Sequence, residues 1–552
     1  MNHKLWSSLF LLALAAHPPE LLHAQRTGNR DTPRRSDRRS SDGPERTRVP
    51  FRSIDGSGNN LRNPDWGSVG ASLFRVARSA YADGTDAPSG PGRPNPRAIS
   101  NALCAQTVSV PNALGASDMV WQWGQFLDHD LDLSPVASPE EPFDIAVPSG
   151  DPYFDPAATG VQVIPLDRTV YVYDASGVRQ QTNAISAFLD ASNVYGSDDE
   201  RAQALRALDG SGCLAVSPGG LLPYNVHGLE NDPTAHDPSF FLAGDVRANE
   251  QVGLLAMHTL WVREHNSWAT VFGLLMPGSD GDLRYEMARR IVGAEMQAIT
   301  YREFLPVLLG PDALAPYRGY RANVKPDIAN AFSAASYRFG HSMLSPSFQL
   351  LDASGHAVLD GSLALRDAFF QPSLVERLGI DPILRGLATQ RAQEGDTLLI
   401  DEVRNFLFGP PGSGGFDLAS LNLQRGRDHG LPSYNRVRRD YGLAPRDFDE
   451  ITSDPELAQS LRDTYGSTRR IDPWLGGLAE DPLPGALVGE LIQAVLKDQF
   501  ERLRDGDRYW YQNVLPPELQ AFVERQSLAT VIRRNTGIGS ELQDDVFHVP
   551  GS

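Results

Sequence analysis

Cysteine is scarce in this chain, which has only Cys104 and Cys213 among its 552 residues. Neither cysteine lies close to another cysteine or to a histidine at the spacing of a zinc site, so a structural zinc centre is not expected. An exported chain could join the two in one disulfide, although a protein of this size does not need that bond to fold. The sequence leaves their pairing open.

Long apolar runs are also lacking. Lys4 precedes an apolar run, Leu5–Ala16, that is too short to cross a bilayer and contains small-residue sites suited to cleavage. This pattern predicts a signal peptide over residues 1–24 rather than a buried first helix, because the segment that follows cannot pack. We therefore expect a secreted or extracytoplasmic protein, periplasmic or extracellular. No later run is long enough for a transmembrane anchor.

Apolar residues are nearly absent from residues 25–50, where eight arginines stand among serine, aspartate, proline and glycine. This composition predicts a disordered, arginine-rich linker. Residues 1–50 carry nine basic and five acidic residues, which leaves a charge of −23 on the remainder of a chain whose net charge is −19. So acidic a body argues against nucleic acid as a partner.

Alternating strand patterns are few, and Gln162–Val172 is the best of them. Helical periodicity is common, and glycine and proline are frequent enough to predict many loops. The segments with helical periodicity are 118–127, 249–272, 283–309, 327–343 and 485–503. With no second linker or internal repeat, we expect residues 51–552 to form one mainly α domain with long loops and little β structure.

The segment Trp123–Leu133, WGQFLDHDLDL, concentrates chemical groups on one predicted helix. At 100° per residue, Gln125 and His129 share a face. Asp128 and Asp130 lie on either side of His129 and point away from each other. The layout suits a catalytic base with two separate anchors, whereas a non-haem iron or di-metal centre would need these ligands to converge.

The remaining histidines differ in setting. His258 and His265 lie on one predicted helix and are expected to pack or to form hydrogen bonds. His341 follows Arg338 by three residues, and Gly340 would let a bulky group approach the backbone closely. Together with His129, His341 forms a candidate pair on opposite sides of a planar cofactor.

Four motifs now occur in a fixed order: WGQFLDHDLDL, then GDVRANEQ (Gly244–Gln251), SYRFGHSM (Ser336–Met343) and LNLQRGRDHGLPSYN (Leu421–Asn435). In this combination the chain resembles the animal-type haem peroxidases of the peroxidase–cyclooxygenase superfamily, in particular peroxidasin-like or bacterial members. The resemblance runs from about Arg52 to at least Leu503 and implies a helical domain that binds haem b.

The resemblance implies a role for each residue of the two central motifs. His129 matches the distal histidine, which takes a proton from hydrogen peroxide and returns it to the departing oxygen. Gln125 would hold a water or a halide on the same face. Arg247 matches the distal arginine, which stabilises charge as the O–O bond breaks. Without the motif, Arg247 would be read as a surface ion pair.

On the other side, His341 matches the proximal ligand of the haem iron. Asn422 would accept a hydrogen bond from the second ring nitrogen of this histidine. Arg338 and Arg425 would bind the haem propionates, because a guanidinium group matches a carboxylate bidentately.

Asp128 and Glu250 match the two carboxylates that form ester links to haem in the family; otherwise both would be ordinary hydrogen-bonded carboxylates. One position departs from the myeloperoxidase-type pattern, since Gln251 stands where those relatives have a methionine bonded to haem. A sulfonium link is excluded here. Bromide, iodide and thiocyanate, which are easier to oxidise, are therefore better expected substrates than chloride.

The segment SAFLDAS resembles the calcium loop of the family. The expected calcium ligands all offer oxygen, as a hard cation prefers. They are Asp130, Ser186, Phe188 through its carbonyl, Asp190 and Ser192.

We therefore expect a peroxidase that reduces hydrogen peroxide and oxidises halides, pseudohalides or small aromatic donors. One alternative is a fatty-acid dioxygenase of the same superfamily, but its radical tyrosine position holds Arg338, and Tyr337 is one place too early. Another is a secreted calcium-binding or adhesive protein with a vestigial haem fold, which the intact set of site residues disfavours. The sequence predicts no oligomeric state.

Overall fold

The computed structural model describes residues 51–358 and 362–551. The predicted signal peptide (1–24) and linker (25–50) lie outside these residues. The longer helices are α2 (Pro96–Leu103), α3 (Met119–Leu131), α6 (Val252–Leu275), α7 (Gly281–Ile299), α11 (Asp381–Thr389), α13 (Leu418–Asp428), α16 (Pro455–Tyr465), α18 (Glu490–Asp505) and α21 (Leu528–Asn535). The shorter ones are α4 (Ser192–Tyr195), α5 (Asp199–Ala204), α8 (Leu305–Leu309), α9 (Asn330–Ala334), α10 (Pro372–Leu378), α12 (Asp401–Arg404), α14 (Tyr434–Asp440), α15 (Phe448–Ile451), α17 (Pro473–Leu478), α19 (Tyr511–Val514) and α20 (Pro517–Val523).

The remaining regular elements are small. One π-helix, η1 (Thr300–Phe304), joins α7 to α8, and the 3-10 helices are η2 (Ser336–His341), η3 (Leu365–Asp367) and η4 (Thr468–Arg470). The strands form three antiparallel pairs: β1 (Ile145–Ala146) with β2 (Val163–Ile164), β3 (Tyr171–Tyr173) with β4 (Arg179–Gln181), and β5 (Ser347–Phe348) with β6 (Leu363–Ala364). The mainly helical prediction is therefore confirmed.

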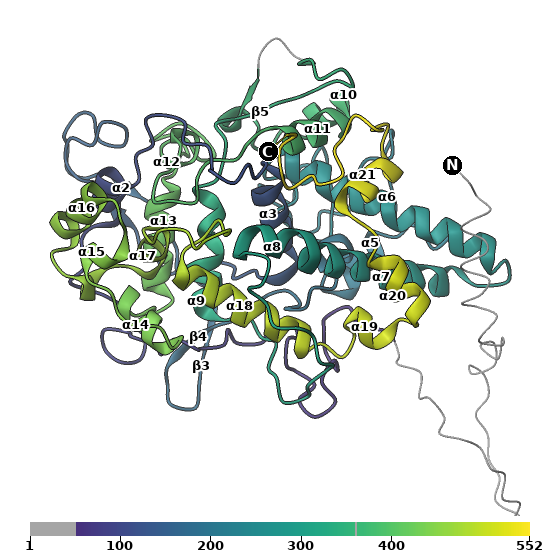
Figure 1. Cartoon of the computed structure of the whole chain (residues 1–552), viewed down its shortest axis with the longest axis horizontal. Helices are drawn as coiled ribbons and strands as arrows, with labels where there is room; N and C mark the ends of the chain where they lie inside the picture. Colours follow the sequence, from purple (N-terminus) through teal and green to yellow (C-terminus); the bar gives the residue numbers. More distant parts are fainter. Residues whose placement is uncertain (1–50, 359–361, 552) are drawn as a thin grey trace, which may run out of the picture.

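Helix α3 lies in the interior, between two groups of helices (Figure 1). The long helices α6 and α7 run side by side toward one end of the molecule, and α14 to α17 gather at the other. Helix α3 packs against α4, α6 and η2, whereas α13 packs against α2, α9 and α17. The motifs expected to carry the chemistry therefore meet near the centre of the fold.

Helix α6 is largely buried in the hydrophobic core. It begins at the side-chain cap of Gln251 and is apolar on most of its circumference, with Leu254, Leu260 and Trp261 fully buried. One continuous hydrophobic cluster runs from Leu73 to Phe547. The described residues thus share one main core, as a single domain requires.

The local predictions can be compared with the structure. The segment 283–309, expected to carry one or two helices, contains most of α7 and all of α8, which are joined by η1, where the hydrogen bonds widen to the π pattern. The segment 327–343 is only partly α-helical, because the backbone of Ala335 (φ −143°, ψ −75°) separates α9 from η2. In the segment 162–172 only Val163–Ile164 and Tyr171–Val172 belong to strands. Between them, Asp167 and Thr169 form isolated bridges to Pro142 and Val136.

The structure also bears on the pairing of the cysteines and on membrane-spanning helices. Cys104 and Cys213 are both free, and Cys104 is buried. Among residues 51–358 and 362–551, none of the helices combines the length and the apolar character that a membrane crossing demands.

Candidate active site

A cavity of about 360 Å³ brings together most of the residues singled out in the sequence. Its wall is formed by α3, the segment before α6, η2, α13 and the apolar residues around Leu407. The predicted site residues that line it are Gln125, Asp128, His129, Arg247, Glu250, Arg338, His341 and Arg425. Asn422 joins them through its contact with His341.

Helix α3 distributes its polar residues as the 100° spacing requires. Gln125, Asp128 and His129 line the cavity, whereas Asp130 is fully buried on the side of the loop 186–192. Gln125 Nε2 donates to Glu250 Oε2 at 2.6 Å. Burial is the main cause that raises the pKa of Asp128 to about 6 and that of Glu250 to about 7.

Arg247 is held by two carboxylates. Its Nε and Nη2 donate to the two oxygens of Asp245, each at 2.9 Å, and its Nη1 donates to Asp128 Oδ2 at 3.0 Å. Burial alone would lower the pKa of Arg247, but Asp245 outweighs it and raises it. The guanidinium group is therefore a permanent, fixed cation in the cavity wall.

Asp245 also faces the predicted base. Its Oδ1 lies 3.4 Å from His129 Nδ1. Burial, followed by the charge of Arg247, lowers the pKa of His129 well below its ordinary value, and Asp245 only partly opposes this. His129 is therefore neutral at physiological pH, the state in which an imidazole can accept a proton.

His341 ends the 3-10 helix η2 and contacts Asn422 of α13. Asn422 Nδ2 lies 2.8 Å from His341 Nδ1, while Asn422 Oδ1 accepts from Arg338 Nη1 at 3.3 Å. The predicted partner is thus in place, but its amide nitrogen faces the ring and its oxygen faces Arg338, so Nδ1 is the acceptor in this arrangement. A neutral His341 that binds iron through Nε2 carries its proton on Nδ1, which requires the amide oxygen to face the ring instead. Burial, and then Arg338, lower the pKa of His341 to about 3.

The two arginines expected to bind the propionates, Arg338 and Arg425, are each held by hydrogen bonds to other parts of the protein. Arg338 Nε donates to the carbonyl of Ser333 at 2.8 Å, and Arg425 Nη1 donates to the carbonyl of Asp167 at 2.8 Å and to Asp428 Oδ2 at 3.1 Å. Each guanidinium group retains further N–H donors. Both side chains border the cavity.

The loop 186–192 closes around Asp130. Asp130 Oδ2 accepts from the backbone N–H groups of Asp190 and Ala191 at 3.1 and 3.2 Å, and its Oδ1 accepts from Ser192 Oγ at 2.9 Å. Ser186 Oγ donates to Asp190 Oδ2 at 3.0 Å. Burial, and then the neighbouring Asp190, raise the pKa of Asp130 to about 8.

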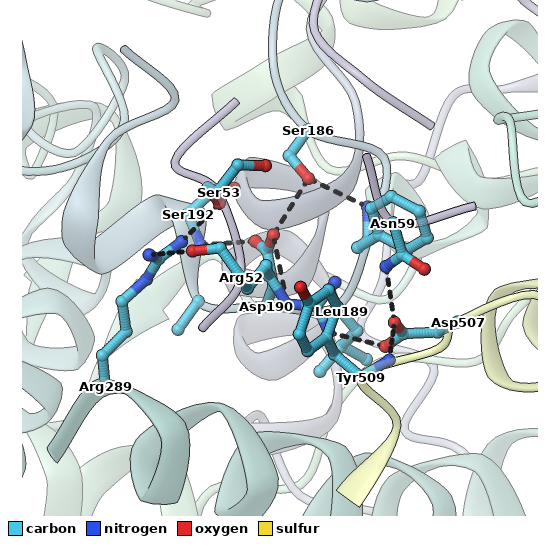
Figure 2. A network of polar contacts seen from close by, with 12 residues as sticks. Arg52, Ser53, Asn59, Ser186, Leu189, Asp190, Ser192, Arg289, Asp507 and Tyr509 are labelled. Carbon is cyan, nitrogen blue, oxygen red and sulfur yellow. Dashed lines mark hydrogen bonds and ion pairs between the residues drawn. The ribbon is translucent and has the colours of Figure 1, made fainter. Parts of the chain in front are cut away.

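The outer side of this loop is contacted by Arg52, near the start of the domain, and by the segment that follows α18, with Asp507 and Tyr509 (Figure 2). Arg52 pairs with Asp507 at 2.7 Å and lies 3.8 Å from Asp190. Its guanidinium group also packs over the rings of Phe188 and Tyr509. Three distant parts of the sequence therefore meet at the loop.

Comparison with known proteins identifies the family. The model of the animal haem peroxidase family matches residues 51–547. Peroxinectin A of Dictyostelium discoideum is 36% identical over 514 residues, which cover 90% of this chain and 95% of that protein. Eosinophil peroxidase of Homo sapiens is 40% identical over 560 residues, which cover 91% of this chain and 77% of that protein. The chain belongs to the animal haem peroxidase family.

Solved structures agree with this assignment. Peroxidase A from Dictyostelium discoideum superposes with a TM-score of 0.83 at 36% identity, over 91% of this chain and all of that one. The fatty acid alpha-dioxygenase of Oryza sativa superposes at 0.77, over 91% of this chain and 87% of that one, but is only 19% identical. At this identity, the dioxygenase shares only the fold with this chain. The similarity to proteins named as peroxidases indicates that the chain is an oxidoreductase that acts on hydrogen peroxide.

An animal haem peroxidase needs haem, and the cavity suits that group. It joins two histidines from different elements with the two arginines Arg338 and Arg425, and with apolar walls such as Trp121 and Phe339. Imidazole nitrogen, guanidinium groups and aromatic surface are what iron, propionates and a flat macrocycle require.

The oxygen atoms of Asp130 and of the loop 186–192 are of the kind that a calcium ion prefers. Asp130 and Asp190 are both buried, and burial, followed by the charge of Asp190, raises the pKa of Asp130. Arg52 and Arg289 oppose the effect of burial on Asp190, and a cation between the two carboxylates would stabilise the ionised form of both. No group of three or more His, Cys, Asp or Glu side chains is arranged for a metal in the described part of the chain. A calcium ion here would rely on these two carboxylates and on hydroxyl and carbonyl oxygens.

Two contributors were missed by the sequence interpretation. Asp245 is part of the motif GDVRANEQ, and its position two residues before Arg247 was the only sequence feature that could have indicated a role for it. Arg52, which closes the loop 186–192, lies 134 positions before the loop begins. No pattern in the sequence connects the two.

Proposed function

We propose that the chain reduces hydrogen peroxide and uses the oxidising power to oxidise bromide, iodide, thiocyanate or small aromatic donors. The observation that carries this is a single cavity in which His129, Arg247 and His341 converge from three separate motifs. Haem, held through His341, would supply the redox chemistry: it would give two electrons to hydrogen peroxide and recover them from the halide, thiocyanate or aromatic donor.

His129 moves the proton. Its lowered pKa keeps the imidazole neutral, so it can take the proton of peroxide and deliver it to the oxygen that leaves as water. Asp245 near Nδ1 stabilises the imidazolium while it holds that proton. Arg247, fixed by Asp245 and Asp128, stabilises negative charge on the separating oxygens.

The other cavity residues orient the cofactor and the reductant. Arg338 and Arg425 hold the propionates with their free N–H donors, and Asn422 orients His341. Asp128 and Glu250 form ester links to haem. Gln251 offers no sulfur for a third link, which favours bromide, iodide and thiocyanate over chloride.

Calcium is held by Asp130, Ser186, Phe188 through its carbonyl, Asp190 and Ser192. Because Asp130 follows His129 directly on α3, the ion also fixes the base in the cavity wall. Chelation of calcium is expected to disturb the haem spectrum. An unchanged spectrum in a protein shown to be calcium-free would refute this coupling.

The architecture we propose is a signal peptide (1–24), an arginine-rich linker (25–50) and a peroxidase domain (51–552). It implies export from the cytoplasm.

The deciding experiment follows the absorption spectrum of the holoprotein as peroxide is added, then measures oxidation of bromide, iodide and thiocyanate. Extraction in acidic solvent tests the ester links, since haem that leaves freely is not covalently held. Oxygen uptake with linoleate would instead favour a dioxygenase. A colourless protein that cannot be reconstituted with haem would favour a vestigial fold.

A further inference from the structure

The side chain of Gln251 is buried between α3 and α6, and all its hydrogen-bonding groups are used. Its Oε1 accepts from the backbone N–H groups of Gly253 and Leu254 at 2.5 and 3.1 Å. Its Nε2 donates to Oε1 of Gln122 at 2.8 Å and to Oε1 of Gln125 at 3.1 Å. A primary amide has two donors and two lone pairs, so no further bond is available to it.

These contacts fix the direction of every amide in the group. Backbone N–H groups can only donate, so the oxygen of Gln251 must face α6 and its nitrogen must face α3. That nitrogen can only donate as well, so Gln125 turns its oxygen toward Gln251. The nitrogen of Gln125 then points to Glu250, to which it donates at 2.6 Å.

A glycine makes this arrangement possible. A Cβ atom at position 253 would collide with Oε1 of Gln122 and would lie 2.8 Å from Oε1 of Gln251. The missing side chain leaves the space in which the amides meet. The first turn of α6 therefore sets the orientation of a residue on another helix.

We propose that Gln251 is a positioning residue that makes Gln125 present an N–H donor, rather than its carbonyl, to the cavity. One N–H of Gln125 is used toward Glu250, so the other is available to a bound molecule. A donor at this place favours halide or thiocyanate anions over neutral aromatic reductants. The inference rests on the proposed function, in which the anion is oxidised in this cavity.

The test is Gln251→Ser in the holoenzyme. A serine hydroxyl also caps a helix, so α6 keeps its N-cap, but it is too short to donate to Gln125. Loss of the orienting bond is expected to raise the dissociation constant of bromide, measured from the absorbance change on titration, by about fivefold. The ratio of kcat/KM for bromide to kcat/KM for a neutral phenol should fall by a similar factor. The cavity left by the shorter side chain lowers the melting temperature, but a loss of stability alone would not change this ratio.

A matched control is Asn95→Ser, the same change from amide to hydroxyl at the cap of α2, where Asn95 Oδ1 accepts from Ala98 N at 3.0 Å. It should leave bromide binding unchanged. If Gln251→Ser does not fold, Gln251→Thr keeps the cap and carries the same expectation.

A double-mutant cycle shows whether Gln251 acts through Gln125. In a Gln125→Ala background, Gln251→Ser should weaken bromide binding no further. An undiminished effect in that background, or no effect in the single variant, overturns the proposal. A wild-type holoenzyme that neither binds nor oxidises bromide overturns the proposed halide chemistry itself, and with it this role.

Discussion

The two histidines of the cavity share one property and differ in another. Burial lowers the pKa of both His129 and His341. The Nδ1 of His129, however, faces the carboxylate of Asp245, whereas the Nδ1 of His341 faces the neutral amide of Asn422. Burial alone therefore does not distinguish a proton carrier from a metal ligand.

The partner of Nδ1 makes the distinction. A carboxylate stabilises the imidazolium, so the side chain near Asp245 can gain and lose a proton during turnover. Burial and then the charge of Arg338 lower the pKa of His341 by more than the hydrogen bond with Asn422 raises it, so a positive ring is disfavoured. The first arrangement suits acid–base chemistry, and the second suits a permanently neutral ligand.

The largest effect is expected for His341→Ala. Loss of the iron ligand should reduce peroxidase activity to that of haem free in solution, because the iron then lacks its protein-derived nitrogen. Haem content after reconstitution and the absorption spectrum check the result. Full activity with a normal spectrum would show that another residue binds the iron.

His129→Ala should separate the two roles. The second-order rate constant for the reaction with peroxide is expected to fall by about 10²- to 10⁴-fold, because proton transfer loses its carrier. Haem content should stay at the wild-type level, since the ligand is intact. A variant that loses haem but keeps its rate per haem would reverse the assignment.

Asp245→Asn makes the partner of His129 neutral, like that of His341. The rate constant with peroxide is expected to fall by about 10- to 100-fold, in the range seen for residues that orient a functional group. Stopped-flow absorbance provides the measurement. Asp232→Asn is a suitable control, because the carboxylate of Asp232 is close enough for its charge to act on Arg247 and Asp245. A similar loss there would point to a general effect of charge.

The smallest effect is a pH dependence that should be nearly absent. Because the pKa of His129 is well below the ordinary value for histidine, the side chain loses its proton only in acidic solution and is neutral at higher pH. Asp128 and Glu250, whose free carboxyl groups have pKa values of about 6 and about 7, do not titrate once they are held in the proposed ester links. The rate constant with peroxide should therefore be flat from about pH 6 to about pH 8 and decline only in more acidic solution. A clear decline between these values, with a midpoint near the ordinary pKa of histidine, would contradict the burial of this group.

The sequence was most informative where neighbouring residues share one helix. The spacing along α3 separated Asp130 from the cavity residues without any knowledge of the fold. Where regular structure fails, periodicity was a poor guide: Ala335 interrupts the predicted helix just before His341, and η1 replaces the middle of another. Both interruptions depend on backbone angles that no residue pattern specifies.

Contacts between motifs could not be predicted from spacing. Gln251 was interpreted by what it lacks, a sulfur atom, whereas the structure shows what it does, which is to cap α6 and hold Gln125. Likewise, the hydrogen bond from Arg338 to the oxygen of Asn422 joins two separate elements, and no spacing in the sequence predicts it. Such details are set by tertiary packing.

The ion pair between Arg52 and Asp507 joins residues 455 positions apart at the outer wall of the loop 186–192. During synthesis from the N-terminus, that wall cannot close until nearly the whole domain has left the ribosome. A contact of such long range is also slow to form by diffusion. The outer wall of the loop beside His129 is thus completed late in synthesis, after the residues that line the cavity, which end at Arg425.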